Sequence, residues 1–350
     1  MIEITLIILI IFLFVLGCVE SYYHKLALYA LPVRIHVNGS RGKSSVTRLI
    51  AAGLRAGGLK TCAKTTGTSP RIIDSDGNDQ IIHRLRSASI GEQVRLLRSF
   101  ARKNLDAIVI ECMAVNPQYQ WISEQKMIKS TASVMTNVRP DHLDEMGHTL
   151  YQNTMSLSNT IPFKGTFVTP LPSKMKSKFD FDLDQKIYNV LLDICKERET
   201  EIQSASADSI PIEFMEKFSY MEHRENVAVA LKVCEINGVE REIALNGMLK
   251  AKPDPGATVI WKINCYGNSN FFVNLMAAND PSSTLNAYLQ LKGRIKDSKV
   301  CIFFNTRSDR RYRTSQLLSL IFNKINPDYL VIRADDLPEE FDQYIDKNKK

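Results

Sequence analysis

The sequence predicts an α/β protein whose parallel sheet is covered by helices on both faces. Strand-like and helical runs alternate along the chain, which is typical of such sheets. A glycine-containing turn joins the strand-like run Val33–Val37 to the helical run Ser44–Leu54. With 350 residues, 44% of them hydrophobic, the chain can bury one large core or two modest ones. A separate apolar run at the N-terminus predicts a membrane anchor in front of this α/β body.

The N-terminal run Ile4–Val19 is almost wholly apolar and is short but usable for crossing a membrane. A cleaved signal peptide is the alternative, but Glu3 is the only charged side chain before the run and no small-residue cleavage site follows it. Lys25 and Arg34 follow the run, so the positive-inside rule places the main body in the cytoplasm. We therefore expect a single-pass anchor over residues 1–24, with the protein at the cell membrane.

The rest of the chain is expected to form two α/β units. A Pro/Gly-rich break at residues 253–256 is the best candidate boundary, so we expect a central domain over 31–254 and a smaller one over 256–350. The stretch from Thr66 to Asn78 is rich in Gly, Ser, Pro and Asp and is expected to be a loop. The expected strands are Val33–Val37, Thr61–Thr65, Leu105–Ile110, Ala132–Met135, Phe271–Leu275, Val300–Phe304 and Tyr329–Ile332, and the expected helices are Ser44–Leu54, Ile90–Lys103 and Asn226–Glu235.

Charge and cysteine content narrow the class of protein. The net charge of +7 suggests an anionic partner such as a nucleotide, an acidic polymer, a nucleic acid or a membrane surface. The seven cysteines are scattered, with no CxxC pair and no zinc spacing. They fit reduced thiols in a cytoplasmic domain better than a disulfide framework.

The turn after the first expected strand has the shortened phosphate-loop pattern G-x-x-G-K-[ST]. Glycines let successive backbone N–H groups point at an anion, and the following helix N-terminus adds its free amides. In this pattern Lys43 reaches the β- and γ-phosphates of a nucleotide, and the Ser44 hydroxyl holds a magnesium ion. The alternative is a glycine turn with a surface lysine. The cofactor-binding candidates are Gly39, Ser40, Arg41, Gly42, Lys43, Ser44 and Ser45.

Two further strand ends carry polar groups. Glu111 follows a buried strand, where a carboxylate could bind magnesium beside the phosphates. Asn137 and the Asp141-His142 pair follow the next one. Each group alone could be an ordinary surface or loop residue; their position in a nucleotide-binding sheet favours a functional role.

A run of arginines follows the expected strand Val300–Phe304. Arg307, Arg310, Arg311 and Arg313 could grip carboxylates bidentately, or they could form a solvated basic loop or contact phosphate. Nucleic-acid binding would also use such a run, but no aromatic-interleaved motif supports it. We expect no nucleic-acid partner.

Together these residues resemble the Mur ligase family, which includes the folylpolyglutamate synthases, and within it the poly-γ-glutamate synthases of the PgsB/CapB family. The resemblance covers most of residues 1–315, including the N-terminal apolar anchor. The strings that carry it are HVNGSRGKSSVTRL, KTTGTSPRII, SIGEQ, IVIECMAVNPQYQ, TNVRPDHLDEMG, KPDPGA and MAANDPSSTLNAY.

The resemblance implies a role for each matching residue. Residues 39–45 would cradle ATP, Glu111 would hold its magnesium, His142 would hold a second metal, and Asn137 would touch the transferring phosphate or its metal. Lys43, Glu111, His142 and Asn137 are thus the catalytic candidates, and Ser44, Glu111 and His142 the metal ligands. The substrate-binding candidates, from loop 66–71, the C-terminal domain and the arginine run, are Thr66, Thr68, Arg71, Asp280, Ser283, Arg307 and Arg310.

The chain departs from the family pattern at three places. Asn279 stands where relatives carry a histidine, and the helical stretch Tyr151–Ile161 lacks the lysine that often holds the second metal. The chain also ends before the last strand and helix that relatives usually have, so the C-terminal domain could be incomplete.

The resemblance implies an ATP- and Mg²⁺-dependent ligase that forms γ-glutamyl bonds through an acyl phosphate. Its partners would be glutamate, the poly-γ-glutamate chain and membrane subunits of a synthase complex. A folylpolyglutamate-type ligase and a membrane-tethered ATP-binding regulator or ATPase remain as alternatives.

Overall fold

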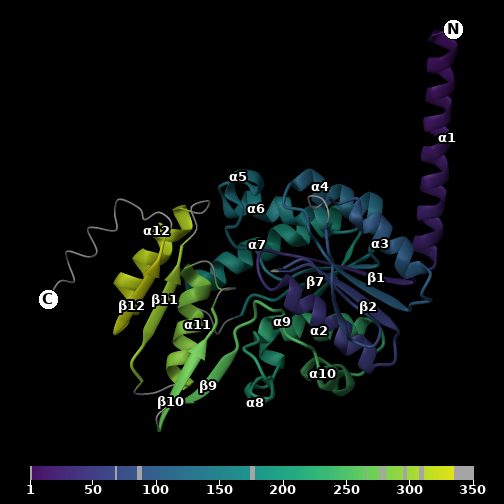
Figure 1. Ribbon diagram of the computed structural model, residues 1–350. Coiled ribbons are helices and arrows are strands. Elements are labelled where there is room, and N and C mark those ends of the chain that lie inside the picture. Colours follow the sequence, from purple (N-terminus) through teal and green to yellow (C-terminus); the bar gives the residue numbers. More distant parts are fainter. Residues whose placement is uncertain are drawn as a thin grey trace. The chain divides into compact units, whose positions relative to one another are not determined.

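The computed structural model describes residues 2–67, 69–84, 89–173, 178–265, 267–275, 278, 281–294, 298–306 and 311–334 (Figure 1). The chain divides into two compact units, Met1–Pro255 and Gly256–Lys350. Thr68, Asp280, Arg307 and Arg310, which the sequence suggested for substrate binding, lie outside the described residues, as does Asn279.

The first unit is built on one eight-stranded sheet. Its order is β4-β3-β2-β5-β1-β6-β7-β8, parallel except for β3 and β4, which extend one edge in antiparallel fashion. This confirms the predicted mainly parallel α/β fold. The strands are β1 (Val33–Asn38), β2 (Thr61–Thr65), β3 (Arg71–Ile73), β4 (Asp79–Ile81), β5 (Ala107–Glu111), β6 (Ala132–Met135), β7 (Thr166–Pro170) and β8 (Glu201–Ala205).

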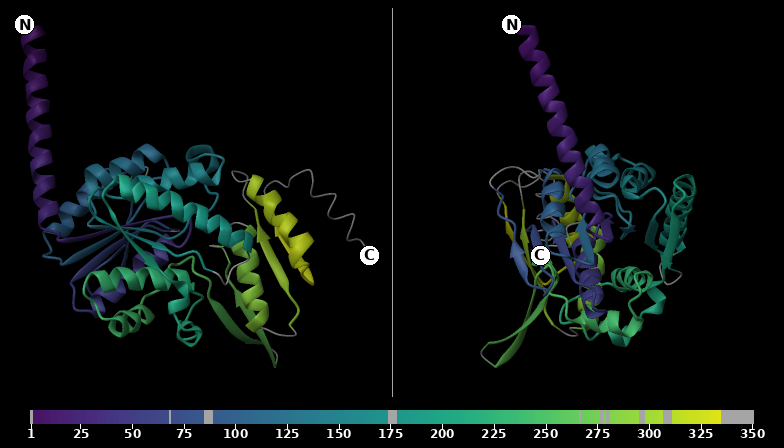
Figure 2. Two further views of the ribbon diagram at one scale, coloured as in Figure 1. Left: turned by 180° about the vertical axis from the view of Figure 1, so that it is seen from behind. Right: turned by 90° about the vertical axis from the view of Figure 1, so that its right-hand side faces the viewer.

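Helices cover both faces of this sheet (Figure 2). Helices α3, α4, α6 and α7 lie on one side, and α2, α9 and α10 lie on the other. The helices are α1 (Ile2–Tyr29), α2 (Lys43–Ala56), α3 (Glu92–Ala101), α4 (Pro117–Ile122), a π-helical turn η1 (Ser123–Ile128), α5 (Leu143–Met146), α6 (Leu150–Leu157), 3-10 turns η2 (Ser158–Thr160) and η3 (Ala207–Ser209), α7 (Lys178–Glu197), α8 (Ile212–Met215), α9 (Arg224–Ile236) and α10 (Arg241–Leu249).

The central strands are largely buried on both faces, as parallel strands between two helical layers must be. Every residue of β2, β5 and β6 is buried. The stretch from Thr66 to Asn78 was expected to be a loop, and this was wrong for part of it. Arg71–Ile73 forms β3, which pairs antiparallel with β2. Backbone pairing along the sheet edge overrides the weak strand propensity of this Asp- and Gly-rich stretch.

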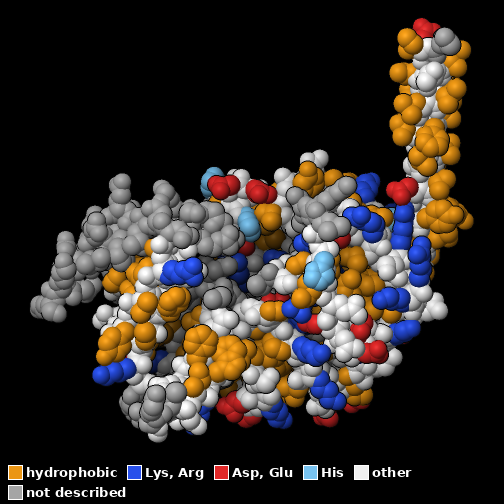
Figure 3. All heavy atoms as spheres, in the orientation of Figure 1, with side chains coloured by type: hydrophobic (Ala, Val, Ile, Leu, Met, Phe, Trp, Pro, Cys, Tyr) orange, Lys and Arg blue, Asp and Glu red, His pale blue; other side chains and the backbone are white. Residues whose placement is uncertain are grey.

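Helix α1 projects from the first unit, and hydrophobic side chains cover the part of it that is free (Figure 3). Its most apolar 18-residue window has a mean hydropathy of 3.0, and none of that window is buried. By length and composition it could cross a membrane, a test that an N-terminal signal sequence also passes. Its last turns pack on the body: Ala27 and Leu28 are buried, and Arg98 of α3 pairs with Glu20 at 3.1 Å.

The second unit contains two small sheets. One is the antiparallel hairpin β9 (Ile260–Cys265) and β10 (Asn268–Val273), and the other is the parallel pair β11 (Cys301–Asn305) and β12 (Tyr329–Arg333). Its helices are α11 (Pro281–Arg294), α12 (Arg311–Leu320) and the π-helical turn η5 (Ile321–Ile325). Leu320, Ile321 and Ile325 form a buried hydrophobic cluster in this unit.

Candidate functional site

The turn between β1 and α2 forms a tight loop because two glycines adopt backbone conformations that other residues avoid. Gly39 has φ +131° and Gly42 has φ +81°. A Cβ on Gly39 would stand 2.2 Å from the Thr136 hydroxyl oxygen, and one on Gly42 would stand 2.7 Å from the Asn226 amide oxygen. Both positions therefore require glycine, both for φ and for space. Helix α2 starts directly after Gly42, so its free N–H groups and the positive end of its dipole lie at this loop.

The loop is pinned to the segment that follows β6. The Ser40 N–H donates to the Asn137 carbonyl at 3.0 Å, and the Arg41 N–H donates to the Asn137 side-chain oxygen at 3.1 Å. The Ser40 hydroxyl donates to the Arg139 carbonyl at 2.8 Å. Asn137 thus shapes the loop. Its expected contact with the transferring phosphate stays a prediction.

Lys43 lies against the loop that it was predicted to serve. Its Nζ donates to the Gly39 carbonyl at 2.6 Å and to the Ser40 carbonyl at 3.4 Å. The ammonium is therefore held over the turn, where loop N–H groups and the helix N-terminus also favour negative charge. This arrangement suits a phosphate chain.

Ser44 and Glu111 meet at the carboxyl ends of neighbouring strands. The Ser44 hydroxyl donates to Glu111 Oε2 at 2.9 Å, and the Thr66 N–H donates to the same oxygen at 2.6 Å. Glu111 is 2% exposed. A hydroxyl beside a buried carboxylate is a set of hard oxygen donors, which is what Mg²⁺ prefers. The residues present fit a magnesium ion, which Ser44 and Glu111 would hold.

His142 stands apart from this pair. It precedes α5 with a left-handed backbone (φ 44°), its side chain is 46% exposed, and its Nε2 lies 4.0 Å from Asp141 Oδ2. Among the described residues no three His, Cys, Asp or Glu side chains gather as a metal site. The expected second metal at His142 therefore stays a prediction with a single candidate ligand.

The substrate-side candidates fall at different places. Thr66 lies at the Glu111 carboxylate, whereas Arg71 is in β3 and pairs with Asp79 at 3.5 Å. Ser283 lies in α11 of the second unit.

Sequence reasoning missed two polar residues at the loop. Asn226, at the start of α9, fills the space beside Gly42 and donates to Glu222 Oε1 at 2.8 Å. Burial raises the pKa of the Glu222 carboxyl, although hydrogen bonds from Asn226, the His223 N–H and Ser45 oppose that shift. The only sequence cue was an asparagine at the head of an apolar helix. Its contact with Gly42, about 180 residues earlier in the chain, depends on the tertiary fold.

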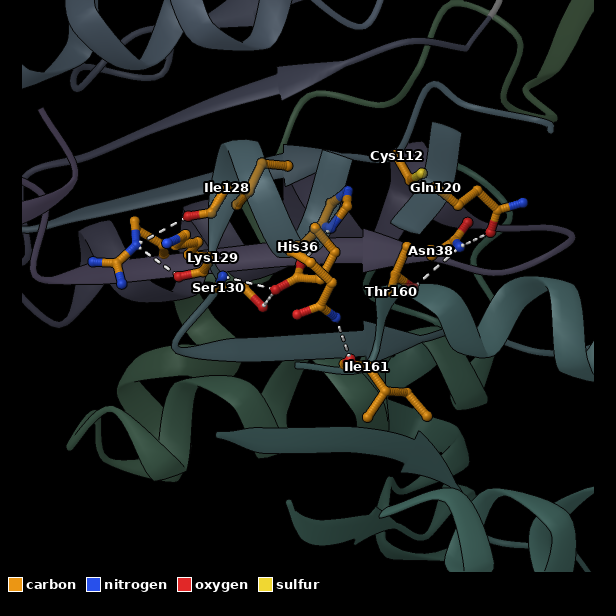
Figure 4. A network of polar contacts seen from close by, with 12 residues as sticks. His36, Asn38, Cys112, Gln120, Ile128, Lys129, Ser130, Thr160 and Ile161 are labelled. Atoms are coloured by element: carbon orange, nitrogen blue, oxygen red, sulfur yellow. Dashed lines mark hydrogen bonds and ion pairs between the residues drawn. The ribbon is translucent and has the colours of Figure 1, made fainter. Parts of the chain in front are cut away.

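A buried polar network supports the strand that leads into the loop (Figure 4). His36 Nδ1 lies 2.7 Å from Glu124 Oε2, and both side chains are fully buried. The other carboxylate oxygen of Glu124 accepts from the N–H and hydroxyl of Ser130, each at 2.9 Å. Burial alone would lower the pKa of His36, but hydrogen bonds to Cys112 and Glu124 raise it to about 9. The network joins β1 to η1.

Comparison with known proteins places this fold and loop in a family. The Mur ligase middle domain matches residues 37–234, and the poly-γ-glutamate synthase CapB C-terminal domain matches residues 260–337. "PGA synthase CapB" of Bacillus subtilis (strain 168) is 38% identical over 91% of this chain and 78% of its own length. The chain belongs to the CapB branch of the Mur ligase family. The resemblance inferred from its motifs is thereby confirmed.

Other relatives agree with this assignment. "Capsule biosynthesis protein CapB" of Bacillus anthracis is 38% identical over 87% of this chain, which spans 64% of that relative's length. A folylpolyglutamate synthase from Thermotoga maritima has a TM-score of 0.60 at 15% identity, covering 94% of this chain and 83% of its own. A structure described as an FPGS–AMPPCP complex has a TM-score of 0.59 at 15% identity, and the match covers 92% of this chain and 86% of that chain. At this identity the structures show the shared fold.

Proposed function

We propose that this CapB-family chain is an ATP-dependent amide ligase that forms γ-glutamyl bonds in poly-γ-glutamate. The observation that carries the proposal is its 38% identity, over 91% of the chain, to a protein described as a PGA synthase. The loop from Gly39 to Ser45 and the adjacent Glu111 supply a nucleotide site of the kind such a reaction needs. The body is cytoplasmic, anchored by α1, and acts with membrane subunits of a synthase complex.

In the first step, a carboxylate oxygen of the acceptor attacks the γ-phosphorus of ATP. The bond from that phosphorus to the β–γ bridging oxygen breaks, giving an acyl phosphate and ADP. The chain's contribution is to bring two anions together, which is a matter of positioning and charge neutralisation. Lys43 and the N–H groups at the start of α2 neutralise the phosphates. A magnesium ion held by Ser44 and Glu111 would supply further positive charge.

In the second step, the amine nitrogen of an incoming glutamate attacks the acyl carbon. The carbon–oxygen bond to phosphate breaks, phosphate leaves with the electron pair, and the amine loses a proton to solvent or to a nearby base. Water would destroy the acyl phosphate, so the site must exclude it while the amine binds. The positive net charge of the chain suits the polyanionic product.

The test is ADP release by the membrane-embedded protein with its partner subunits, with and without glutamate. We expect glutamate-dependent ADP release together with a glutamate polymer, and loss of both in Lys43→Ala. Lys164→Ala, which changes an exposed lysine of the same unit, serves as the control and should retain both. ATP turnover that is indifferent to glutamate would refute the ligase and favour an ATPase or regulator. Folate as the preferred acceptor would indicate a folylpolyglutamate-type ligase.

A further inference from the structure

A cavity lies on the first unit, between α2, the turn that joins β3 to β4 and the segment after α10. It has a volume of about 520 Å³, within the range of about 300–1,000 Å³ typical of ligand pockets. Its walls are α2 from Arg48 onward, the segment from Ile73 to Asp79, and the end of α10 with the residues after it; α2 and α10 lie side by side in Figure 1. No residue of the phosphate loop lines it.

The lining carries more positive than negative charge. The cations are Arg48, Arg55, Lys250 and Lys252, and the acidic side chains are Asp76 and Asp79. Arg48 and Asp79 neutralise each other through two hydrogen bonds of 3.0 and 2.9 Å. Of the other lining charges, Arg55, Lys250 and Lys252 are cations and Asp76 is a carboxylate, and the nearby Asp74 also attracts Arg55. This excess favours an anionic ligand.

Of the lining cations, Arg48 is buried and Arg55 is partly buried, so part of the positive charge is built into the fold. Arg48 is 4% exposed, and its Nε is buried without a hydrogen-bond partner in the described structure. Arg55 donates to the Thr61 carbonyl at 3.3 Å, and burial lowers the pKa of its guanidinium. Partial burial of the Arg55 guanidinium costs hydration energy, and an anion in the cavity would offset part of that cost.

The apolar part of the lining argues for an aliphatic polyacid over a nucleotide. It consists of small or aliphatic residues (Ala52, Ala56, Ile73, Gly247 and Ala251), and the lining set contains no aromatic side chain on which a base could stack. Methylene groups can lie on such a surface while carboxylates reach the cations. A γ-glutamyl chain has both parts, with one free carboxylate on each residue.

The cavity also lies close to the phosphate loop along the chain and in space. Arg48 is one helical turn beyond Ser44 on α2, and it donates to the Lys252 carbonyl at 3.3 Å. Two residues after Lys252, the Asp254 carboxylate lies 3.2 Å from the point where a Cβ on Gly67 would stand, and the Ser44 hydroxyl lies 2.6 Å from that point. A chain in the cavity would therefore lie near the residues that handle ATP.

We propose that this cavity binds a segment of the poly-γ-glutamate chain through its carboxylates, as a holding site beside the ligase centre. The inference rests on the proposed function for the identity of the polymer. Lys250 and Lys252 contact the carboxylates at the open side, while Arg55 provides the positive wall behind them. Retaining the chain here between additions would favour repeated elongation of one polymer over release.

The test is equilibrium binding of a fluorescent γ-glutamyl decamer, D and L in turn, to the detergent-solubilised full chain without nucleotide. The variant Lys250→Gln/Lys252→Gln is compared with Lys186→Gln/Lys196→Gln, which removes the same charge from exposed lysines of α7. We expect the first variant to raise the Kd at least tenfold. The slope of log Kd against log salt concentration should fall by about one to two, because up to two lysine–carboxylate contacts are lost. The control should stay within about twofold, and both should keep the wild-type thermal midpoint.

Equal affinities of the two variants for the decamer would refute the holding site. Displacement of the decamer by inorganic phosphate, at the same ionic strength and the same concentration of charge, would refute it as well. The outcome is independent of catalysis because no turnover is needed. A chain that binds the decamer through Lys250 and Lys252 but releases no ADP with glutamate would refute the ligase alone. A ligase whose decamer affinity ignores these lysines would refute the holding site alone.

Discussion

Replacing Glu124 by glutamine removes the buried charge that faces His36 while keeping the shape of the side chain. Hydrogen bonds to Cys112 and Glu124 raise the pKa of His36 from its ordinary value of about 6.5 to about 9. A difference of about 2.5 pKa units at about 1.4 kcal/mol each corresponds to about 3 kcal/mol of stability. Loss of one partner from a buried ion pair typically costs about 3–5 kcal/mol. Because Cys112 also helps to raise the pKa of His36, we expect Glu124→Gln to lower the free energy of unfolding by up to about 3 kcal/mol at pH 6.

The sign of the pH dependence follows from the raised pKa of His36. The charged imidazole stabilises the fold fully below pH 6.5, and this contribution is lost as the pH rises through about 9. The free energy of unfolding of the wild type should fall by about 3 kcal/mol across that window. In Glu124→Gln, the part of this pH-dependent loss of stability that comes from the His36–Glu124 pair should be absent.

The assay is urea unfolding of the detergent-solubilised chain, followed by tryptophan fluorescence. The chain has two tryptophans, and Trp261→Phe leaves Trp121, in α4 directly before the turn that carries Glu124, as the reporter. Glu199→Gln is the matched control, because Glu199 pairs with Lys164 at 3.6 Å with both side chains over 70% exposed. It should change stability by less than about 0.5 kcal/mol. Equal effects of the two substitutions, or a wild type with the same stability at pH 6.5 and 9, would refute the reasoning.

Three further outcomes follow from the site. Gly42→Ala places a side chain at a left-handed backbone position and against Asn226. The ATP affinity, measured by isothermal titration calorimetry, should therefore fall at least tenfold. An unchanged affinity would contradict the loop geometry. Glu111→Gln keeps the shape but removes the charge, so the Mg²⁺ concentration for half-maximal ADP release should rise at least tenfold. His142→Ala should raise the magnesium requirement or abolish ligation while leaving ATP affinity intact, and an unchanged magnesium titration would exclude His142 from any metal site.

The sequence predicted the centre of the fold well because most of its strands are short apolar runs bounded by turn residues. The bounds of β2 and β6 match the expected runs, and the pairing of Ser44 with Glu111 follows from parallel strands that end at one edge. Strands β7 and β8 and the antiparallel edge were not predicted. Their residues are more polar or more exposed, so strand pairing rather than local pattern determines them.

The site was predictable only where neighbouring residues act together. The glycines, Lys43 and Ser44 form one contiguous motif, so the pattern itself located them. Asn226 and Glu222 reach the same loop from a distant helix, and no local pattern in one sequence reports that contact.

Helix α1 is longer than a bilayer requires. Its 28 residues measure about 42 Å, whereas the hydrocarbon core of a membrane is about 30 Å thick. The remaining turns are already part of the body, held by Glu20 to Arg98 and by His24, whose Nε2 lies 2.8 Å from the Met127 carbonyl. A span of α1 across the bilayer would thus act as a stiff stalk without a hinge. The ATP-handling edge would then stand at a constant height and angle above the lipid, and any subunit in the bilayer would always meet the same flank of the enzyme.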